Sequence, residues 1–441
     1  PRGGAADDDR APARDARVIP GRPALARLAE RRLVIWAVFA GIHLVLGLIN
    51  LTSPSLPLGD VSWVYRAWVE AAVHSGYWVG IHADWVYPIL ALLPMLAAAA
   101  AGFEFYSSTW LTLVLLLNAA ALAVLTGVGR TGRNHRAAWW WLAFLALLGP
   151  IALGRLDAIT VPLALVGVIW LAKRPAVAGV LFAVAAWMKV WPAAVALAAV
   201  VALRDRRKIL AAAILTSLLV LLIAQLYGSG LHVFSFLTTQ TDRGMQIEAP
   251  VATPWLWHAL ATGESRLYYD TAILTFQVEG PGVEVAAGLV TPALAVAVLA
   301  VLWLGWRALR AGAAGDALFP LLALALVVTL IAVNKVGSPQ FVCWLAVPVL
   351  AGLLAGSRSF RVPAVLSLLL AALTQVVYPH LYNALLTLHP LMLVTLTVRN
   401  LLYFVLLAWA ARQLWRLGRR DERGASAGTS RNSEPALTLE P

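Results

Sequence analysis

Long apolar runs separated by short polar segments recur along this sequence from residue 33 to residue 411. A helix needs about 20 apolar residues, at a rise of about 1.5 Å each, to cross a hydrocarbon layer of about 30 Å. The pattern therefore predicts an all-α polytopic membrane protein with about twelve transmembrane helices. The expected spans are residues 33–51, 87–102, 109–128, 138–153, 158–172, 175–203, 209–227, 284–305, 316–333, 340–356, 362–378 and 390–411.

Composition agrees with this pattern. Of the 441 residues 61% are hydrophobic and 13% are charged, which leaves no room for a large soluble catalytic domain. We expect one membrane domain, residues 33–411, between disordered cytoplasmic tails at 1–32 and 412–441. The first apolar run has no small-residue cleavage site after it and is expected to be retained. A single cysteine, Cys343, excludes an intrachain disulfide and a cysteine metal cluster.

The net charge of +12 is distributed as in a membrane protein, not as in a nucleic-acid-binding protein. Arginines precede the first span, follow the last span and gather in the loops at 204–208, 307–310 and 358–361. Cytoplasmic loops carry such an excess of Lys and Arg. We therefore expect a plasma-membrane protein with both termini in the cytoplasm.

The topology between residues 87 and 203 has two solutions. Strict alternation of the spans places the basic segments 130–136 and 173–174 outside, against the charge rule. If 87–128 crosses only once in net and 175–203 is a hairpin of two short helices turning at "MKVWP", both segments return to the cytoplasm. We favour the hairpin, whose helices of about 15 residues would reach only about 22 Å and border a water-filled cavity.

The first outer loop, residues 52–84, alternates aromatic and polar residues at helical spacing in "VSWVYRAWVEAAVHSGYW". This pattern predicts a helix in the membrane interface, with Trp63, Trp68 and Trp78 at headgroup depth. Asp60 precedes it, and two interpretations are open. The carboxylate caps the free amides of the helix, or it stands at the membrane boundary as a base that takes a proton from a hydroxyl.

Other polar residues fall on the same outer side, where a cavity would accommodate them. They are Arg155, Asp157, Lys189, Asp242, Arg243, Gln246, Glu248, Asn334, Lys335, Ser338, Gln340, His380 and His389. Structural explanations exist for several: Arg155 and Asp157 pair with each other, Lys189 extends its amine to the interface, and the two histidines are satisfied there. Together, however, several cations beside few carboxylates suit an anionic group such as a phosphate.

Five stretches in this order carry a resemblance to a known family. They are "DVSWVYR" (60–66), "YPILALLPM" (87–95), "AGVLFAVAAWMKVWP" (178–192), "RGMQIEAPVATPWLW" (243–257) and "NKVGSPQFVCWLAVP" (334–348). The chain resembles glycosyltransferase family 87, which includes the actinobacterial polyprenyl-phosphate-mannose-dependent mannosyltransferases and has the multi-helix GT-C membrane fold. One departure is Gly154-Arg155-Leu156-Asp157, where such proteins often carry an Asn-Gly-Gln-type motif.

The resemblance implies that Asp60 is the catalytic base, in the first extracytoplasmic loop. It implies a polyprenyl-phosphate sugar donor, most naturally of mannose, and a glycolipid or glycan acceptor among the membrane lipids. Lys189, Arg243, Lys335 and Gln340 are candidates for the donor phosphate and sugar. Tyr65, Arg66, Arg155, Asp157, Gln246, Asn334, Ser338 and His380 complete the candidate substrate-binding residues.

The chemistry that follows is an inverting transfer in which the lipid phosphate leaves without protonation, so one carboxylate suffices. It requires no cofactor and no metal, and the sequence has no glycine-rich phosphate loop for a nucleotide. The alternatives are a transporter or flippase of lipid-linked sugars and a non-catalytic scaffold. Neither an inverted repeat nor polar groups near the midplane support the flippase.

Overall fold

The structure, a computed structural model, describes residues 32–127, 132–239 and 243–419. Of the expected tails, 1–32 and 412–441, residues 1–31 and 420–441 lie outside the described residues. The last helix continues to Leu417, beyond the expected end of the last span at residue 411. Its last turns pack on the preceding helices, with the guanidinium of Arg307 stacked 4.1 Å from the Trp415 ring.

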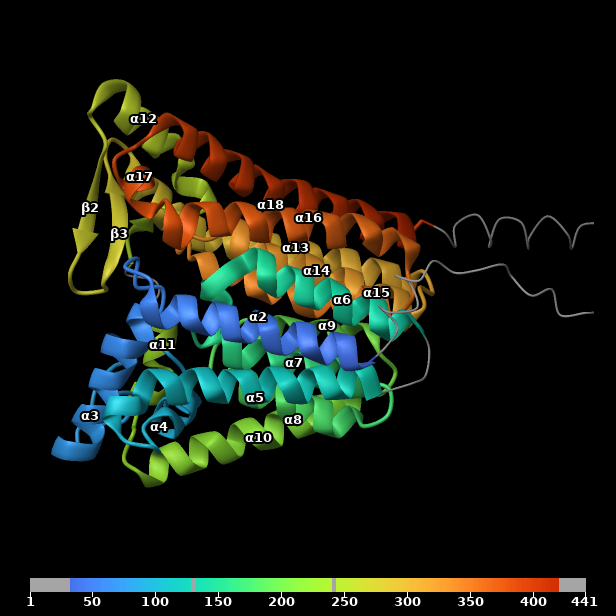
Figure 1. The fold of residues 1–441 in the computed structure, drawn as a ribbon. Coiled ribbons are helices and arrows are strands. Elements are labelled where there is room, and N and C mark those ends of the chain that lie inside the picture. The colour runs from blue at the N-terminus through green and yellow to red at the C-terminus, as the bar shows by residue number, and fades with distance from the viewer. Residues whose placement is uncertain (1–31, 128–131, 240–242, 420–441) are drawn as a thin grey trace, which may run out of the picture.

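Long helices lying side by side make up most of the molecule, and the described chain begins and ends at the same end of the bundle (Figure 1). The helices are α2 Arg32–Thr52, α3 Arg66–Ser75, α4 Leu92–Ala98, α5 Tyr106–Gly127, α6 Gly132–Leu148, α7 Asp157–Trp170, α8 Pro175–Ala186, α9 Pro192–Ala202, α10 Arg206–Leu226, α11 Ser235–Thr238, α12 Thr253–Thr262, α13 Val283–Arg310, α14 Gly315–Ala332, α15 Ala346–Leu354, α16 Arg361–Gln375, α17 Tyr382–Leu386 and α18 Pro390–Leu417.

Within the described ranges, 7 helical segments are long and apolar enough to cross a membrane, which makes this a multi-pass membrane protein. Others, such as α7, α8 and α9, are apolar but shorter than 18 residues. The count of about twelve spans therefore stays a prediction. Helix α14 occupies the centre, with 78% of its apolar window buried, against 17% for α10 and for α13, whose exposed leucines and valines suit contact with lipid.

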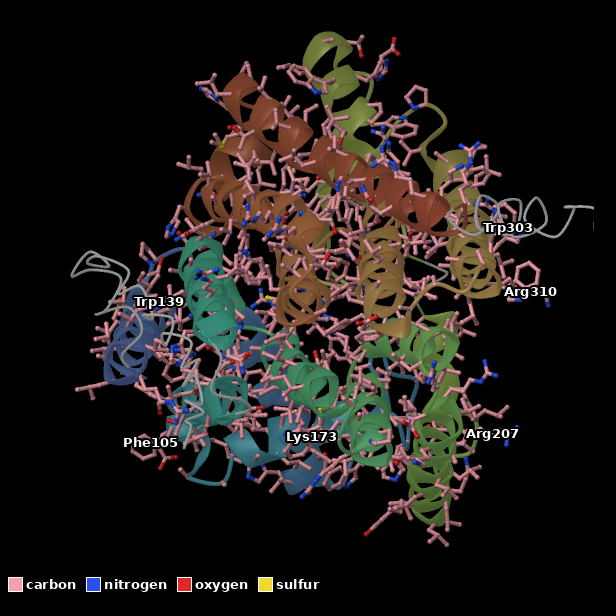
Figure 2. The ribbon with its side chains drawn as sticks, turned by 90° about the vertical axis from the view of Figure 1, so that its right-hand side faces the viewer. Phe105, Trp139, Lys173, Arg207, Trp303 and Arg310 are labelled. Carbon is pink, nitrogen blue, oxygen red and sulfur yellow. The ribbon has the colours of Figure 1, made fainter. Side chains whose placement is uncertain are left out.

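The structure contains the α8–α9 hairpin of the favoured solution for residues 87–203. The side of the membrane on which the basic segments lie stays a prediction. Residues 87–102 form a 3₁₀ turn, Ile89–Ala91, and the short helix α4, and α8 and α9 turn back on each other at Trp187–Trp191. The ends of α5, α7 and α9 and the start of α14 line one cavity together with Arg204 and Asp205. Figure 2 views the bundle from this basic end and labels Lys173 in the α7–α8 turn, Arg207 at the start of α10 and Arg310 at the end of α13.

The opposite end carries the short elements. A turn of π-helix, η1 Asp60–Tyr65, continues into α3, as the interfacial pattern predicts. Trp63 is exposed on it, whereas Trp68 is half-buried and packs edge-on against Trp85. One aromatic face of this amphipathic segment therefore packs against other residues of the protein. The headgroup depth expected for these rings stays a prediction.

A three-stranded antiparallel sheet in the loop before α13 was not predicted. Its strands are β1 Met245–Gln246, β2 Arg266–Asp270 and β3 Thr275–Glu279, in the order β1-β3-β2. Gln246 lies opposite Gln277, and Tyr269 lies opposite Phe276. Its inner face joins α12, α17 and the start of α18 in a separate hydrophobic cluster around Val278 and Leu396. The sheet therefore projects from the bundle at the end opposite the basic loops (Figure 1).

This arrangement predicts which ends of the helices are accessible in a cell. Single cysteines replacing Arg207 and Glu264, both exposed, should react differently with a membrane-impermeant maleimide, because the basic end should face the cytoplasm. We expect labelling of Glu264→Cys in intact cells and of Arg207→Cys only after permeabilisation. Cys343 is buried and should give no background. The reverse pattern would contradict the orientation.

Candidate active site

Two adjoining cavities lie at the end of the bundle that carries the sheet. The Asp60 cavity has a volume of about 530 Å³ and is lined by Asp60, Arg155 and many aromatic rings. The Lys189 cavity, of about 330 Å³, has walls from the tip of the α8–α9 hairpin, α11, α13 and α14 and contains Lys189 and Lys335. The residues common to both linings are Val86, Tyr87, Arg243, Ser338 and Gln340. The two spaces therefore meet along these residues.

Asp60 forms an ion pair in the wall of its cavity. Its Oδ2 lies 2.8 Å from Nε of Arg155, while 40% of the Asp60 side chain stays exposed. The residue at the N-cap position of η1 is Gly59, and no side chain caps the helix. The capping interpretation of Asp60 is therefore wrong, and the carboxylate is instead oriented towards the cavity by a buried cation.

Arg155 is fixed by partners from distant segments. Its Nη1 donates to the carbonyl oxygens of Pro57 and Gly154, both at 2.8 Å, and Nη2 donates to the hydroxyl of Tyr378 at 3.2 Å. Gly154 lies so close to the Pro57 carbonyl that a Cβ would approach it to 2.9 Å. Burial disfavours the guanidinium charge, but Asp60 and the neighbouring tyrosines outweigh burial and raise the Arg155 pKa. Arg155 is thus a permanently charged, rigid support.

Asp157 and Lys189 form a second pair. Lys189 Nζ at the tip of the α8–α9 hairpin donates to Asp157 Oδ2 at 2.7 Å, and Trp344 Nε1 donates to Oδ1 at 2.5 Å. Asp157 is fully buried at the start of α7. The expected pairing of Arg155 with Asp157 is therefore wrong, because each of them binds a partner from another segment. Lys189 does not extend to the interface either, since 14% of its side chain is exposed.

Several buried polar atoms on the walls of the Asp60 cavity have no hydrogen-bond partner within the described residues. They are Nε of Arg243, Nε2 of Gln246, Oε1 of Gln340 and Oγ1 of Thr275. Burial lowers the pKa of Arg243. Unsatisfied buried polar groups cost roughly 1–3 kcal/mol each, so a cluster of them around one cavity indicates a polar ligand.

The segment 334–340 closes the cavities from the side of α14. The backbone N–H of Gln246 donates to the backbone carbonyl of Lys335 at 2.9 Å. Gly337 lies against the backbone of Ala249, where a Cβ would not fit. Asn334 accepts the amide hydrogen of Val336 and donates to Leu330 O, which shapes the turn after α14. Lys335 and Ser338 reach the Lys189 cavity from this turn.

The remaining candidates divide into two groups. Tyr65 is buried in the wall of the Asp60 cavity, and burial raises its pKa. Arg66 pairs with Glu70 at 2.7 Å and is not among the lining residues of either cavity. His380 is exposed and is not a lining residue, whereas Tyr378, two residues earlier, is.

Sequence reasoning missed a buried ion pair behind the Asp60 cavity. Nη1 of Arg399 lies 2.7 Å from Oε2 of Glu248, and both side chains are 3% exposed. Nη2 of Arg399 also donates to the Glu248 carbonyl. Glu248 lines the cavity, and Arg399 lies within the long apolar helix α18. The signal was present, since a charged residue inside an apolar run points to the bundle interior.

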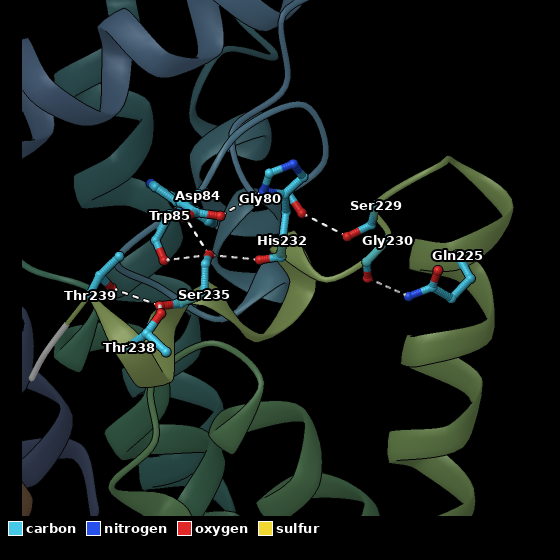
Figure 3. Close-up of polar contacts among 10 residues, drawn as sticks. All are labelled: Gly80, Asp84, Trp85, Gln225, Ser229, Gly230, His232, Ser235, Thr238 and Thr239. Atoms are coloured by element: carbon cyan, nitrogen blue, oxygen red, sulfur yellow. Dashed lines mark hydrogen bonds and ion pairs between the residues drawn. The ribbon is translucent and has the colours of Figure 1, made fainter.

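The loop before α4 is bound to the segment after α10. His232 Nδ1 lies 2.6 Å from Oδ1 of Asp84, and Ser235 Oγ accepts from the amide of Trp85 at 2.7 Å (Figure 3). These contacts fix Trp85 and Tyr87 beside the cavities.

In the described part of the chain, no group of three or more His, Cys, Asp or Glu side chains is placed to hold a metal ion.

Comparison with known proteins gives one match. The model of glycosyltransferase family 87 matches residues 85–278, which confirms the resemblance seen in the sequence. No curated protein and no solved structure matches the chain. The matched segment includes Arg155, Lys189 and Arg243, whereas Asp60 and residues 334–340 lie outside it.

The buried Asp157–Lys189 pair predicts a stability effect. Asp157→Asn leaves the Lys189 ammonium without its counter-charge, which should cost roughly 3–5 kcal/mol and lower the thermal midpoint in detergent. The double variant with Lys189→Met should lose less than the sum of the two single variants. The exposed pair Asp205–Lys208 provides the control, and Asp205→Asn should cost no more than about 1 kcal/mol. Additive losses at Asp157 and Lys189 would contradict the coupling.

Proposed function

Since residues 85–278 match glycosyltransferase family 87, a family of glycosyltransferases, we propose a specific transfer reaction for this membrane protein. The enzyme moves a sugar, mannose by its resemblance, from a polyprenyl-phosphate donor to a glycolipid or glycan acceptor on the extracytoplasmic side. The observation that carries the proposal is the position of Asp60, on a polar cavity that adjoins an apolar cavity containing two lysines.

The Lys189 cavity suits the lipid phosphate of the donor. Apolar side chains such as Phe236, Leu294 and Leu330 line it, together with Lys189 and Lys335. A polyprenyl chain would lie against the apolar residues, with its phosphate beside the ammonium groups. The sugar would then extend past Arg243 and Gln340 into the Asp60 cavity, where unpartnered polar atoms are available to its hydroxyls.

The chemical step follows from this placement. Asp60 accepts the proton of an acceptor hydroxyl, and the hydroxyl oxygen forms a bond to the anomeric carbon as the bond to the phosphate oxygen breaks. Negative charge grows on the leaving lipid phosphate, where fixed cations stabilise it. Attack opposite the leaving group inverts the anomeric configuration, so a β-linked donor would give an α-linked product. Arg155 orients Asp60 and is a positioning residue.

Replacement of Asp60 tests this mechanism. Asp60→Asn and Asp60→Ala should reduce transfer of labelled mannose from polyprenyl-phosphate-mannose by about 10²–10⁴-fold, because the base is lost. Glu264→Gln changes an exposed acid at the same end, outside both cavity linings, and should transfer like the wild type. Equal transfer by folded Asp60 variants would place the base elsewhere. Transport of intact donor without transfer would favour the flippase alternative.

Arg243 provides a second test. Its buried Nε has no partner within the described residues, so a phosphate or sugar oxygen is its natural acceptor. Arg243→Gln should lower kcat/KM for the donor by about 100-fold. Arg266→Gln is the matched control, because Arg266 is 78% exposed on β2 and lines neither cavity. Similar losses in both variants would contradict a direct role for Arg243.

A further inference from the structure

The Asp60 cavity lies between two aromatic walls. One wall comes from the first outer loop and the segment before α4, and the other from the sheet and the α16–α17 connection. The first wall contains Tyr65, Trp68, Trp85 and Tyr87, and the second contains Tyr269, Phe276, Tyr378 and Tyr382. Rings pack against each other within each wall. The ring centroids of Tyr65 and Trp68 are 5.9 Å apart, and those of Phe276 and Tyr382 are 6.0 Å apart.

Such walls suit a sugar ring. The faces of aromatic rings carry partial negative charge, and the C–H groups on the flat face of a pyranose carry partial positive charge, so the two stack favourably. The unpartnered Thr275 Oγ1 on the sheet and Gln246 Nε2 beside it would serve the ring hydroxyls. Aromatic faces combined with a few polar atoms therefore indicate a carbohydrate in preference to a purely apolar ligand.

Of the Asp60 and Lys189 cavities, only the Asp60 cavity is lined by residues of the β2–β3 hairpin. Tyr269, Thr275 and Phe276 belong to its lining and are absent from the lining of the Lys189 cavity. The donor enters the Asp60 cavity across the residues common to both cavities, such as Arg243 and Gln340. The hairpin side of the Asp60 cavity is therefore left for the second substrate, the acceptor.

The hairpin is built to hold its turn in a fixed shape. Oδ1 of Asp270 accepts the amide hydrogens of Ala272 and Ile273, at 2.9 and 3.3 Å, and Oδ2 accepts from Gln277 Nε2 at 2.8 Å. Leu274 adopts a left-handed conformation with φ of 53°, which is costly for a leucine. A strained turn fixed by one carboxylate suits a recognition surface, since less order has to be gained on binding.

We infer that the β2–β3 hairpin forms the acceptor subsite and that its occupant is a sugar residue of a glycan, stacked on Tyr269 while one of its hydroxyls faces Asp60. The inference rests on the proposed function, and it assigns to that reaction an acceptor class and a specificity-determining residue. The ring of Tyr269 is available for this contact, because the residue is 46% exposed. Its ring centroid lies 4.9 Å from that of Phe276, so the two rings form one surface.

The neighbouring tyrosine provides a matched control. Side chains alternate between the two faces of a strand, and Tyr268 lines a separate cavity with Arg243 and Lys335 and not the Asp60 cavity. It is 37% exposed, close to the value for Tyr269. Both tyrosines would suit a membrane interface equally well. A difference between their variants therefore reports on the cavity and not on membrane contact.

The experiment measures sugar binding and transfer with octyl α-mannobioside as the acceptor probe, on purified full-length protein in detergent. Tyr269→Ala should weaken calorimetric binding of the probe and raise its KM about tenfold, with the KM for the donor unchanged. Tyr269→Phe keeps the ring and should behave like the wild type, as should Tyr268→Ala. Loss in Tyr269→Ala with rescue by Tyr269→Phe would distinguish stacking from loss of the hydroxyl.

Three outcomes would overturn the inference: no binding of the probe to the wild type, equal effects of Tyr268→Ala and Tyr269→Ala, or equal transfer to a sugarless octyl tetraethylene glycol. The proposed function fails separately. If the wild type binds the probe at Tyr269 but transfers no sugar from any polyprenyl-phosphate donor, the transferase reaction is wrong while the sugar subsite stands. If transfer depends on Asp60 but not on Tyr269, only the hairpin assignment falls.

Discussion

A guanidinium at the edge of a hydrocarbon layer is stable only if the protein replaces its water, and Arg155 shows how this requirement organises the site. Its partners are the carboxylate of Asp60, the carbonyls of Pro57 and Gly154 and the hydroxyl of Tyr378. They belong to the segment between α2 and α3, the residues just before α7 and the connection between α16 and α17. Satisfying one cation therefore joins the two aromatic walls and sets the direction of the Asp60 side chain between them.

Two other buried cations are also paired with a buried carboxylate. Lys189 is balanced by Asp157, and Arg399 by Glu248. Breaking such pairs is costly, so these charges serve first to fix the tip of the α8–α9 hairpin and the segment that follows β1. Arg243 differs, because no carboxylate of the described residues lies within salt-bridge distance of it and its Nε has no hydrogen-bond partner among them. The positive charge of Arg243 therefore lies unbalanced at the junction of the two cavities, where it is available to the donor in the proposed reaction.

The sequence predicted the helical bundle, the α8–α9 hairpin and the gathering of basic loops at one end, because hydropathy and charge report directly on contact with lipid and water. It did not predict the pairing of charges. Arg155 and Asp157 are two residues apart, and side chains at that spacing point to different sides, so each found a distant partner. The sheet was missed because β1 has two residues and pairs with a strand about 30 residues later, a contact that no local pattern encodes. Arg399 was overlooked although it interrupts an apolar run, and the position of His380 depended on the fold of the α16–α17 connection.

The β2–β3 hairpin has a consequence for how such an enzyme diversifies. Asp60, Arg155, Arg243 and Tyr378 are drawn from segments spread over most of the chain, so a change in the catalytic half requires coordinated changes at many places. The hairpin, by contrast, is one uninterrupted stretch from Arg266 to Glu279 whose turn is fixed by its own Asp270. Insertions or exchanges within that short region of the gene would alter what the cavity accepts while the reaction itself is inherited unchanged.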